Sequence, residues 1–258
     1  MKKFIALMLV LVMALALVAC GGKNDAASVK TVESGKLIMA TNAAFPPYEY
    51  YEGDKIVGID AEIAQAIAEK LGLELVIDDM EFDSIIEAVK GGKADMGLAG
   101  MTVTDERKEV VNFTASYATG VQVVIVAEGS AITSVDDMFA DGAFTTIGVQ
   151  RNTTGDLYTT WDLEEAGMAE IMRYSKGAEA IQALLTGKVD CVVIDNEPAK
   201  AFVAENAGLV ILDTEYAVED YAAAMNKGNE ELFKAVNAAL EELIADGTVK
   251  AIVDKYIN

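Results

Sequence analysis

The chain of 258 residues contains no histidine and only two cysteines, Cys20 and Cys191. The lack of histidine excludes Ser–His and Cys–His catalytic pairs and every metal site that needs an imidazole ligand. Cys191 lies inside the apolar run 189–194, so we expect a small buried side chain there rather than a nucleophile. Neither a metal ion nor another cofactor is expected.

Basic residues are also scarce. Lys and Arg number 20 against 42 Asp and Glu, which gives a formal net charge of −22. A charge of this size repels nucleic acid and anionic lipid headgroups and favours solubility. No basic patch interrupts it, so we exclude nucleic-acid binding.

The N-terminal hydrophobic run is too short for a typical spanning helix. Two lysines precede 16 apolar residues from Phe4 to Ala19, whereas a membrane span needs about 20. A basic start, an apolar stretch and small residues at its end are typical of an export signal. The phrase L-V-A-C-G at 17–21 resembles the lipobox of bacterial lipoproteins, which implies cleavage before Cys20 and lipid on its thiol. An ordinary secretory signal is the alternative.

We therefore predict a lipoprotein signal peptide at 1–19, then lipidated Cys20 and a flexible polar tether to residue 35. Removing the signal takes two lysines, which leaves 18 basic and 42 acidic residues and a charge of −24. With Cys20 lipidated, Cys191 has no partner for an intrachain disulfide. We expect a monomer anchored outside the cytoplasmic membrane, in the periplasm or on the outer face of a Gram-positive cell.

One phrase occurs twice, 95 residues apart. I-E-A-V-K-G-G-K-A-D stands at 86–95, I-Q-A-L-L-T-G-K-V-D stands at 181–190, and each leads into an apolar strand. Solenoid repeats have periods of roughly 20–50 residues, which excludes that class. The repeat instead predicts two similar α/β lobes with a cleft between them. Chance recurrence of a helix–Gly–Lys–strand turn is the alternative.

Strands and helices alternate in both halves, which predicts mostly parallel sheets covered by helices on both faces. The segments 117–127 and 214–224 are expected to cross between the lobes. This assigns 36–119 plus 221–258 to the first lobe and 120–220, with the hinge strands, to the second. Pro46 and Pro47 predict a stiff loop. The remaining predicted strands are 36–40, 73–77, 94–98, 146–149, 170–174 and 209–212. The predicted helices are 58–71, 85–90 (capped by Asp83 or Ser84), 135–139, 154–166, 198–206, 230–245 and 248–256, and the second copy of the repeat supplies a helix followed by a strand within 177–194.

Ligands of open α/β sheets bind beyond the carboxyl ends of the strands. Arg107 follows such an end, in the first turn of a short helix that Thr104 can cap. Its guanidinium fork matches a carboxylate, although a surface pair with Asp105 or Glu109 is the alternative. Asp195 ends the second copy's strand and superposes on Gly100 by the 95-residue offset. Its carboxylate suits an ammonium group, and capping of the next helix is the competing role.

A helix is predicted to begin near Thr154. Its free backbone N–H groups suit an anion, and capping by Thr153 is compatible with that role.

Several phrases in order resemble the amino-acid-type (family 3) periplasmic solute-binding proteins of ABC importers. They cover nearly all of 36–258 and are T-N-A-A-F-P-P-Y at 41–48, G-I-D-A-E-I at 58–63, E-F-D-S-I-I at 81–86, A-G-M-T-V-T-D-E-R at 99–107 and V-V-I-D at 192–195. The resemblance implies a periplasmic-binding-protein-like type II fold, in which two α/β lobes joined by two crossing strands enclose a ligand cleft.

The resemblance also implies roles for the candidate residues. Arg107 would bind the α-carboxylate of an amino acid and Asp195 its α-ammonium group. Phe45 and Phe82 would enclose the side chain, and Gly100, Thr102 and Thr154 would add hydrogen bonds. The predicted ligand-binding set is Asn42, Phe45, Phe82, Ala99, Gly100, Thr102, Arg107, Gln150, Thr153, Thr154 and Asp195.

Some positions depart from the family pattern. Asn42 stands where many binders of polar and basic amino acids have Asp, Ala99 and Gly100 replace the serines of some members, and Gln150 and Gly155 are at positions that vary with ligand. We therefore expect a neutral, polar or apolar, L-amino acid, delivered to an ABC transporter permease, and no enzymatic activity. The alternatives are an exported dehydratase of cyclic acids, with Glu49 or Glu197 as acid or base, and a ligand-sensing receptor subunit.

Overall fold

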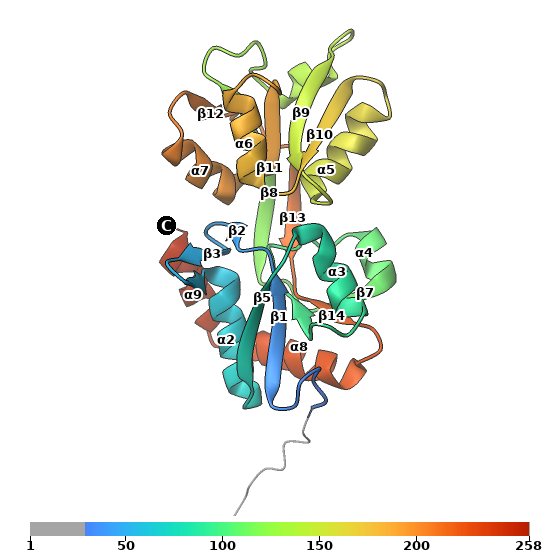
Figure 1. Ribbon diagram of the computed structural model, residues 1–258, viewed down its shortest axis with the longest axis vertical. Coiled ribbons are helices and arrows are strands. Elements are labelled where there is room, and N and C mark those ends of the chain that lie inside the picture. The colour runs from blue at the N-terminus through green and yellow to red at the C-terminus, as the bar shows by residue number, and fades with distance from the viewer. Residues whose placement is uncertain (1–28, 258) are drawn as a thin grey trace, which may run out of the picture. The chain divides into compact units, whose positions relative to one another are not determined.

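Two separate mixed sheets form the cores of two lobes (Figure 1). The computed structural model describes residues 29–257, in which a compact unit begins at Thr31. The predicted signal peptide and Cys20 lie outside the described residues. None of the described helices is long and apolar enough to cross a membrane.

The first lobe contains a five-stranded sheet of order β5-β1-β6-β14-β7. Strand β1 is parallel to β5 and β6, whereas β14 is antiparallel to β6 and β7. The prediction of a mostly parallel sheet therefore holds for the first three strands only. The strands are β1 (Lys36–Thr41), β5 (Glu74–Asp79), β6 (Met96–Gly97), β7 (Val111–Phe113) and β14 (Ala224–Asn226), and the helices are α2 (Ile59–Leu71), α3 (Phe82–Lys90), α4 (Asp105–Val110), α8 (Glu230–Ala245) and α9 (Thr248–Tyr256).

The second lobe has a sheet of order β10-β9-β11-β8-β12, with β13 paired to β8. Strand β9 is parallel to β10 and β11, and β8 is antiparallel to β11, β12 and β13. Its elements are β8 (Ala118–Ala127), β9 (Thr145–Gln150), β10 (Ala169–Tyr174), β11 (Cys191–Asp195), β12 (Leu209–Ile211), β13 (Ala217–Tyr221), α5 (Thr154–Thr159), α6 (Gly177–Leu185), α7 (Asn196–Glu205) and a short 3-10 helix, η1 (Val135–Phe139).

Apolar side chains lie on both faces of the first sheet. Leu37 and Met39 alternate with Ile38 and Ala40 along β1, and all four are buried because helices cover both faces. Ile38 and Ala40 belong to the cluster that packs under α3. Helix α2 buries one stripe and ends at Gly72, whose φ of 67° is the left-handed conformation of a helix stop.

The 95-residue repeat proves to be an equivalent turn in both lobes. Gly92 and Gly187 follow α3 and α6 with φ of 66° and 69°. Asp95 N–H then donates to Ile38 O, and Asp190 N–H donates to Thr146 O. The two carboxylates accept from backbone N–H groups of the neighbouring strand, Ile38 for Asp95 and Thr146 for Asp190. The two copies of the phrase thus fasten the helix, turn and strand of each lobe in the same way.

Two predictions about local structure were wrong. The predicted helix at 154–166 ends as α5 at Thr159 and continues as a π-helical segment, η2 (Thr160–Glu164). The hydroxyls of Thr159 and Thr160 donate to the carbonyls of Gly155 and Asp156, a type of bond that bends helices. Helix α3 begins after Glu81 without a side-chain cap, so neither Asp83 nor Ser84 caps it.

The predicted stiff loop is part of a third, small sheet. It consists of β2 (Ala44–Phe45), β3 (Glu49–Glu52) and β4 (Lys55–Val57), which pair antiparallel. Pro46 and Pro47 occupy the turn between β2 and β3, where no ladder N–H is required of them. This hairpin places Phe45 and Glu49 side by side in register, next to the cleft.

Candidate functional site

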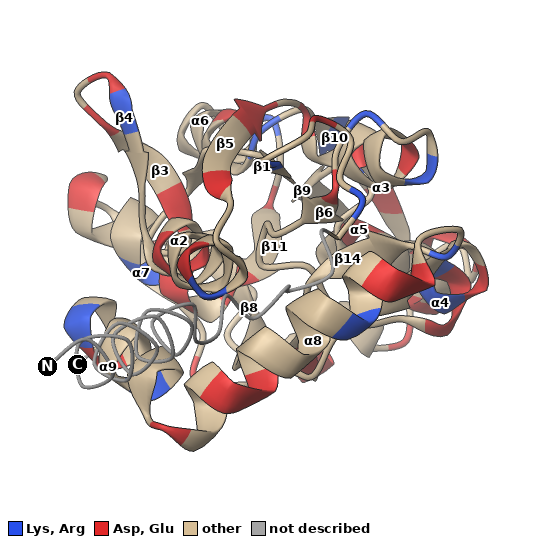
Figure 2. Cartoon of the chain, turned by 90° about the horizontal axis from the view of Figure 1, so that it is seen from below, with Lys and Arg blue, Asp and Glu red and all other residues tan. Residues whose placement is uncertain are grey.

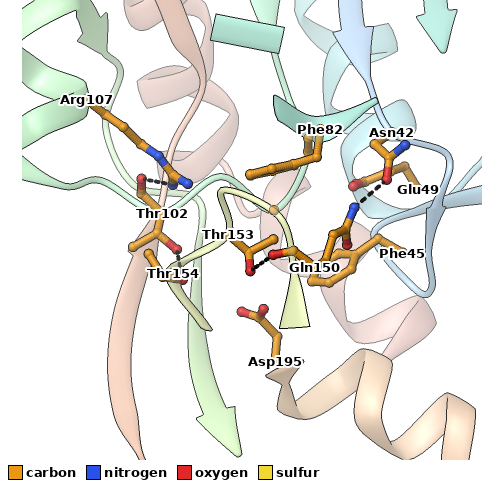
Figure 3. A pocket seen from close by; sticks show the side chains of 12 residues that line it. Asn42, Phe45, Glu49, Phe82, Thr102, Arg107, Gln150, Thr153, Thr154 and Asp195 are labelled. Atoms are coloured by element: carbon orange, nitrogen blue, oxygen red, sulfur yellow. Dashed lines mark hydrogen bonds between the residues drawn. The ribbon is translucent and has the colours of Figure 1, made fainter. Parts of the chain in front are cut away.

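All eleven predicted ligand-binding residues line one pocket between the lobes, together with Glu49 (Figure 3). The pocket and its opening to solvent together contain about 300 Å³ of space that protein atoms do not fill. The first lobe contributes its residues from the ends of β1 and β6, from β2 and β3 and from the starts of α3 and α4. The second lobe contributes its residues from the ends of β9 and β11 and from the start of α5. The carboxyl-end rule for open α/β sheets therefore located the pocket correctly.

Arg107 extends from the first turn of α4 into the pocket and is only 6% exposed. Thr104 caps this turn by accepting from Arg107 N–H. The guanidinium donates from Nη1 to Thr102 O and from Nη2 to Asn152 O, both at 2.8 Å. The central carbon of the guanidinium, Cζ, lies 5.4 Å from the centre of the Phe82 ring.

Two of the five guanidinium N–H groups are thus used, and the others remain for a ligand. Burial lowers the pKa of Arg107 to about 10, so the group keeps its charge at neutral pH. The surface alternative for Arg107 is wrong, because Asp105 pairs with Lys108 instead.

Asp195 stands at the N-cap position of α7, but its side chain makes no capping bond. The hydroxyl of Tyr221 donates to its Oδ1 instead. Burial, with the charge of Glu219 adding to it, raises the pKa of Asp195 to about 8. The carboxyl group is therefore largely protonated at neutral pH, and a cation placed beside it would favour the charged form.

Asn42 and Gln150 meet across the cleft. Gln150 Nε2 donates to Asn42 Oδ1 at 3.0 Å and to Ser175 O at 3.1 Å, while Asn42 Nδ2 donates to Met80 O. Thr153 caps α5 by accepting from Asp156 N–H, and its hydroxyl donates to Gln150 O. The hydrogen bond between Gln150 and Asn42 thus joins the two lobes at the pocket.

Glycine at position 100 has a steric cause. Its φ is 51°, and a Cβ placed there would lie 2.8 Å from Cε1 of Phe45. The Gly100 N–H donates to Asp60 Oδ2, so only its carbonyl is left for a ligand. Ala99, Phe45 and Phe82 supply apolar surface to the same pocket.

Glu49 is the pocket residue absent from the predicted binding set. It is fully buried, and neither carboxyl oxygen has a well-aligned hydrogen-bond partner among the described residues, although the carboxyl group of Asp60 lies within hydrogen-bonding reach. Burial, with the charge of Asp60 adding to it, raises the pKa of Glu49 well above its usual range. No signal in the sequence separates Glu49 from the exposed Glu52 on the same short strand.

Three further residues connect the site to the strands between the lobes: Gln122 on β8, and Glu219 and Tyr221 on β13. Glu219 accepts hydrogen bonds from Thr102, Gln122 and Thr154. Within residues 29–257, no group of His, Cys, Asp and Glu is arranged to hold a metal ion. The charged and polar side chains of the pocket can hold a charged small molecule.

The sequence matches the family model described as bacterial extracellular solute-binding proteins, family 3, over residues 37–258. It is 33% identical to the arginine-binding extracellular protein ArtP of Bacillus subtilis, over 100% of this chain and 99% of that protein.

Two solved structures of an ancestral arginine-binding protein are similar to this one. The form bound to arginine has a TM-score of 0.80 and 38% identity, covering 87% of this chain and 99% of that chain. The form bound to glutamine has a TM-score of 0.79 and 37% identity, with the same coverage.

Proposed function

Because the chain belongs to family 3 of the bacterial extracellular solute-binding proteins, we propose that it captures a free L-amino acid outside the cytoplasm and delivers it to an ABC transporter permease. Like these relatives, it is a binding protein and not an enzyme. The proposal extends to the class of amino acid, to the residues that hold it and to a lipid anchor on Cys20.

The two ends of an amino acid fit the two charged sides of the pocket. The free N–H groups of Arg107 suit the α-carboxylate, and Asp195 suits the α-ammonium group. Hydrogen bonds to charged groups contribute about 1.5–3 kcal/mol each. Three or four of them support micromolar or tighter binding after the cost of ordering.

We propose a cationic side chain on the ligand, with L-arginine as the first candidate. The observation that carries this choice is the buried carboxyl group of Glu49, which lines the pocket without a well-aligned partner. A zwitterion uses Arg107 and Asp195 and leaves Glu49 with Asp60 as its carboxyl neighbour and no cationic partner. A guanidinium or ammonium group at the far end of the ligand would pair with it, and Phe45 and Phe82 would enclose the aliphatic part.

A neutral polar amino acid such as glutamine is the second candidate. It follows the prediction made from Asn42, and the carboxamides of Asn42 and Gln150 face each other at the pocket. Glu49 would then bind such a ligand in its protonated form. The two candidates differ in charge, and this difference makes them separable by experiment.

The ligand would act as a bridge that favours lobe closure. Arg107 and Asp195 lie on different lobes, so a ligand held by both stabilises the closed arrangement over the open one. Strands β8 and β13 would absorb the rotation. Lipid on Cys20 would keep the protein at the membrane beside its permease.

Titration calorimetry of the twenty L-amino acids against a soluble form of residues 21–258 tests the proposal. We expect arginine to bind with micromolar or lower Kd and Arg107→Ala and Asp195→Ala to abolish binding. Tight binding of a neutral amino acid alone would replace the cationic assignment. Tight binding that survives both substitutions would exclude the proposed site.

A further inference from the structure

Glu49 and Asp60 form a pair of buried carboxyl groups at the pocket wall. Glu49 begins β3 and lines the pocket (Figure 3), whereas Asp60 lies in the first turn of α2, outside the pocket lining. Both side chains are 0% exposed, and their carboxyl groups lie within hydrogen-bonding reach of each other. Two ionised carboxylates this close repel each other, most strongly where water is excluded, so the pair holds a proton.

The proton belongs on Glu49 rather than on Asp60. Oδ2 of Asp60 accepts from Gly100 N–H and from the hydroxyl of Tyr117, both at 2.8 Å, and the start of a helix favours a negative charge. Glu49 has no comparable donor, because neither of its carboxyl oxygens has a well-aligned partner among the described residues, and Oδ1 of Asp60 is in the same condition. A proton on Glu49 can be donated to this oxygen and leaves Asp60 ionised, with a pKa that burial raises only to about 6.

Titratable groups from several elements face Glu49. They are Asp60 on α2, Asp79 on β5, Asp195 at the end of β11, Tyr48 in the turn before β3 and Tyr117 before β8. None of these groups is a cation. Burial, with the charges of the three aspartates adding to it, raises the pKa of Glu49, and burial also raises the pKa of both tyrosines, which therefore stay neutral. A cationic ligand would bring the positive charge that favours release of the proton.

We propose that Asp60 is a positioning residue that keeps a proton on Glu49 in the empty pocket, so that a cationic amino acid must displace this proton in order to bind. The proposal rests on the proposed capture of a cationic amino acid. On binding, the O–H bond of Glu49 breaks, the proton passes to water, and the ionised carboxylate pairs with the positive charge of the ligand. Asp60 acts through Glu49 and sets how strongly the affinity for a cation depends on pH.

Infrared spectroscopy tests the pair without any ligand, because the carbonyl stretch of a protonated carboxyl group is separate from that of a carboxylate. The band of Glu49 is identified by its loss in Glu49→Gln and is then titrated with pH in the ligand-free protein. We expect its midpoint to fall by about one pH unit or more in Asp60→Asn, since this change removes the neighbouring charge and offers an amide N–H to Glu49. Asp79→Asn is the matched control, because it removes an exposed charge that also acts on Glu49, and it should move the midpoint by less than about half a unit.

Calorimetry in two buffers of different ionisation enthalpy connects this shift to ligand binding. At a pH midway between the two midpoints, Glu49 is mostly protonated in the wild-type protein and mostly ionised in Asp60→Asn. On binding L-arginine, the wild-type protein should therefore release about half a proton or more in excess of the variant. A purely structural effect of the substitution would change Kd without changing the number of protons released.

An unchanged midpoint in a folded Asp60→Asn protein, checked by thermal unfolding, would overturn the proposal, and so would a shift no larger than that of Asp79→Asn. If Asp60→Asn does not fold, the comparison of the wild-type protein with Glu49→Gln decides, since absence of a Glu49 band at pH 7 would equally overturn it. A wild-type protein that binds no cationic amino acid would instead refute the proposed function, and the infrared titration would still decide whether the pair holds a proton.

Discussion

At the scale of single residues, the cleft gathers more carboxyl groups than cations. Glu49, Asp60, Asp195 and Glu219 are all buried, and Arg107 is the buried cation of the described residues. Burial raises the pKa of the first three. A site that keeps carboxyl groups partly protonated when empty favours cations, because each bound positive charge stabilises an ionised carboxylate.

Replacing Arg107 by lysine should weaken binding although the charge is kept. Lysine cannot donate to Thr102 O and Asn152 O while also presenting two parallel N–H groups to a carboxylate. The loss of about two charged hydrogen bonds should raise Kd by about a hundredfold or more in calorimetry. Arg151→Lys is the matched control at an exposed arginine and should change Kd by less than about threefold. Similar effects of the two changes would contradict the role of Arg107.

Glu49 should make the binding of a cationic amino acid depend on pH. Its pKa is raised in the empty pocket, which favours the protonated form, and a cation that pairs with the carboxyl group favours loss of the proton. Asp195, with a pKa of about 8, should lose part of a proton to solution in the same way at neutral pH. Affinity should therefore increase as pH rises from 6 to about 8 and decrease as pH falls.

Calorimetry at pH 7 in two buffers of different ionisation enthalpy measures the protons released. The wild-type protein should release about one more proton on binding arginine than Glu49→Gln does. An equal number for both proteins would mean that Glu49 does not pair with the ligand.

The sequence contains enough to identify Arg107 and Asp195 but not Glu49. Arg107 and Asp195 follow apolar strands, and the carboxyl ends of strands in an α/β sheet meet at one edge. Glu49 is the first residue of a four-residue strand whose last two residues, Tyr51 and Glu52, are exposed. Its burial depends on a hairpin that turns at two prolines, and neither apolar periodicity nor charge patterning predicts where that hairpin docks.

At the scale of elements, the repeated phrase forms the same helix, turn and strand in both lobes, but its aspartate is buried in one lobe and exposed in the other. Asp95 is 3% exposed and accepts from Val32 N–H and Ile38 N–H, whereas Asp190 is exposed and its carboxylate accepts from Thr146 N–H. The aspartates at these two equivalent positions therefore contribute differently to the free energy of unfolding.

Asp95→Asn should destabilise the protein more than Asp190→Asn. Asparagine has one acceptor oxygen where Asp95 uses two, so one buried backbone N–H loses its partner at a cost of about 1–3 kcal/mol. At the exposed Asp190 water replaces the lost bond, and the cost should stay below about 1 kcal/mol. Urea unfolding of both variants measures the difference. Equal losses would mean that burial does not separate the two sites.

Long periodic elements were predictable, and short ones were not. The prediction placed α8 and α9 at the residues where they occur, because their apolar stripes extend over two or more turns and Asp246 and Gly247 separate them. The three-residue strand β7 and the small sheet of β2, β3 and β4 were missed. Segments this short have no measurable periodicity, and their pairing is determined by tertiary contacts.

At the scale of the whole molecule, charge separates the two ligand candidates. Aspartate and glutamate outnumber lysine and arginine across the elements shown in Figure 2, in keeping with the net charge of −22. Such a field attracts a cation from solution and acts weakly on a zwitterion without net charge. Salt screens this attraction, since the Debye length falls from about 30 Å at 0.01 M to below 8 Å at 0.5 M.

The association rate of arginine should therefore decrease about threefold or more when salt rises from about 0.01 M to about 0.5 M, as measured by stopped-flow fluorescence. Its dissociation rate should change less, because the closed pocket is shielded from the salt solution. Glutamine gives the matched control, since its association rate should stay nearly constant.

If the natural ligand is neutral, the tightest-binding amino acid will show no salt dependence, and Glu49 must then be protonated in the complex. If it is cationic, salt dependence and proton release will occur together, because both arise from the same positive charge reaching the same buried carboxyl group.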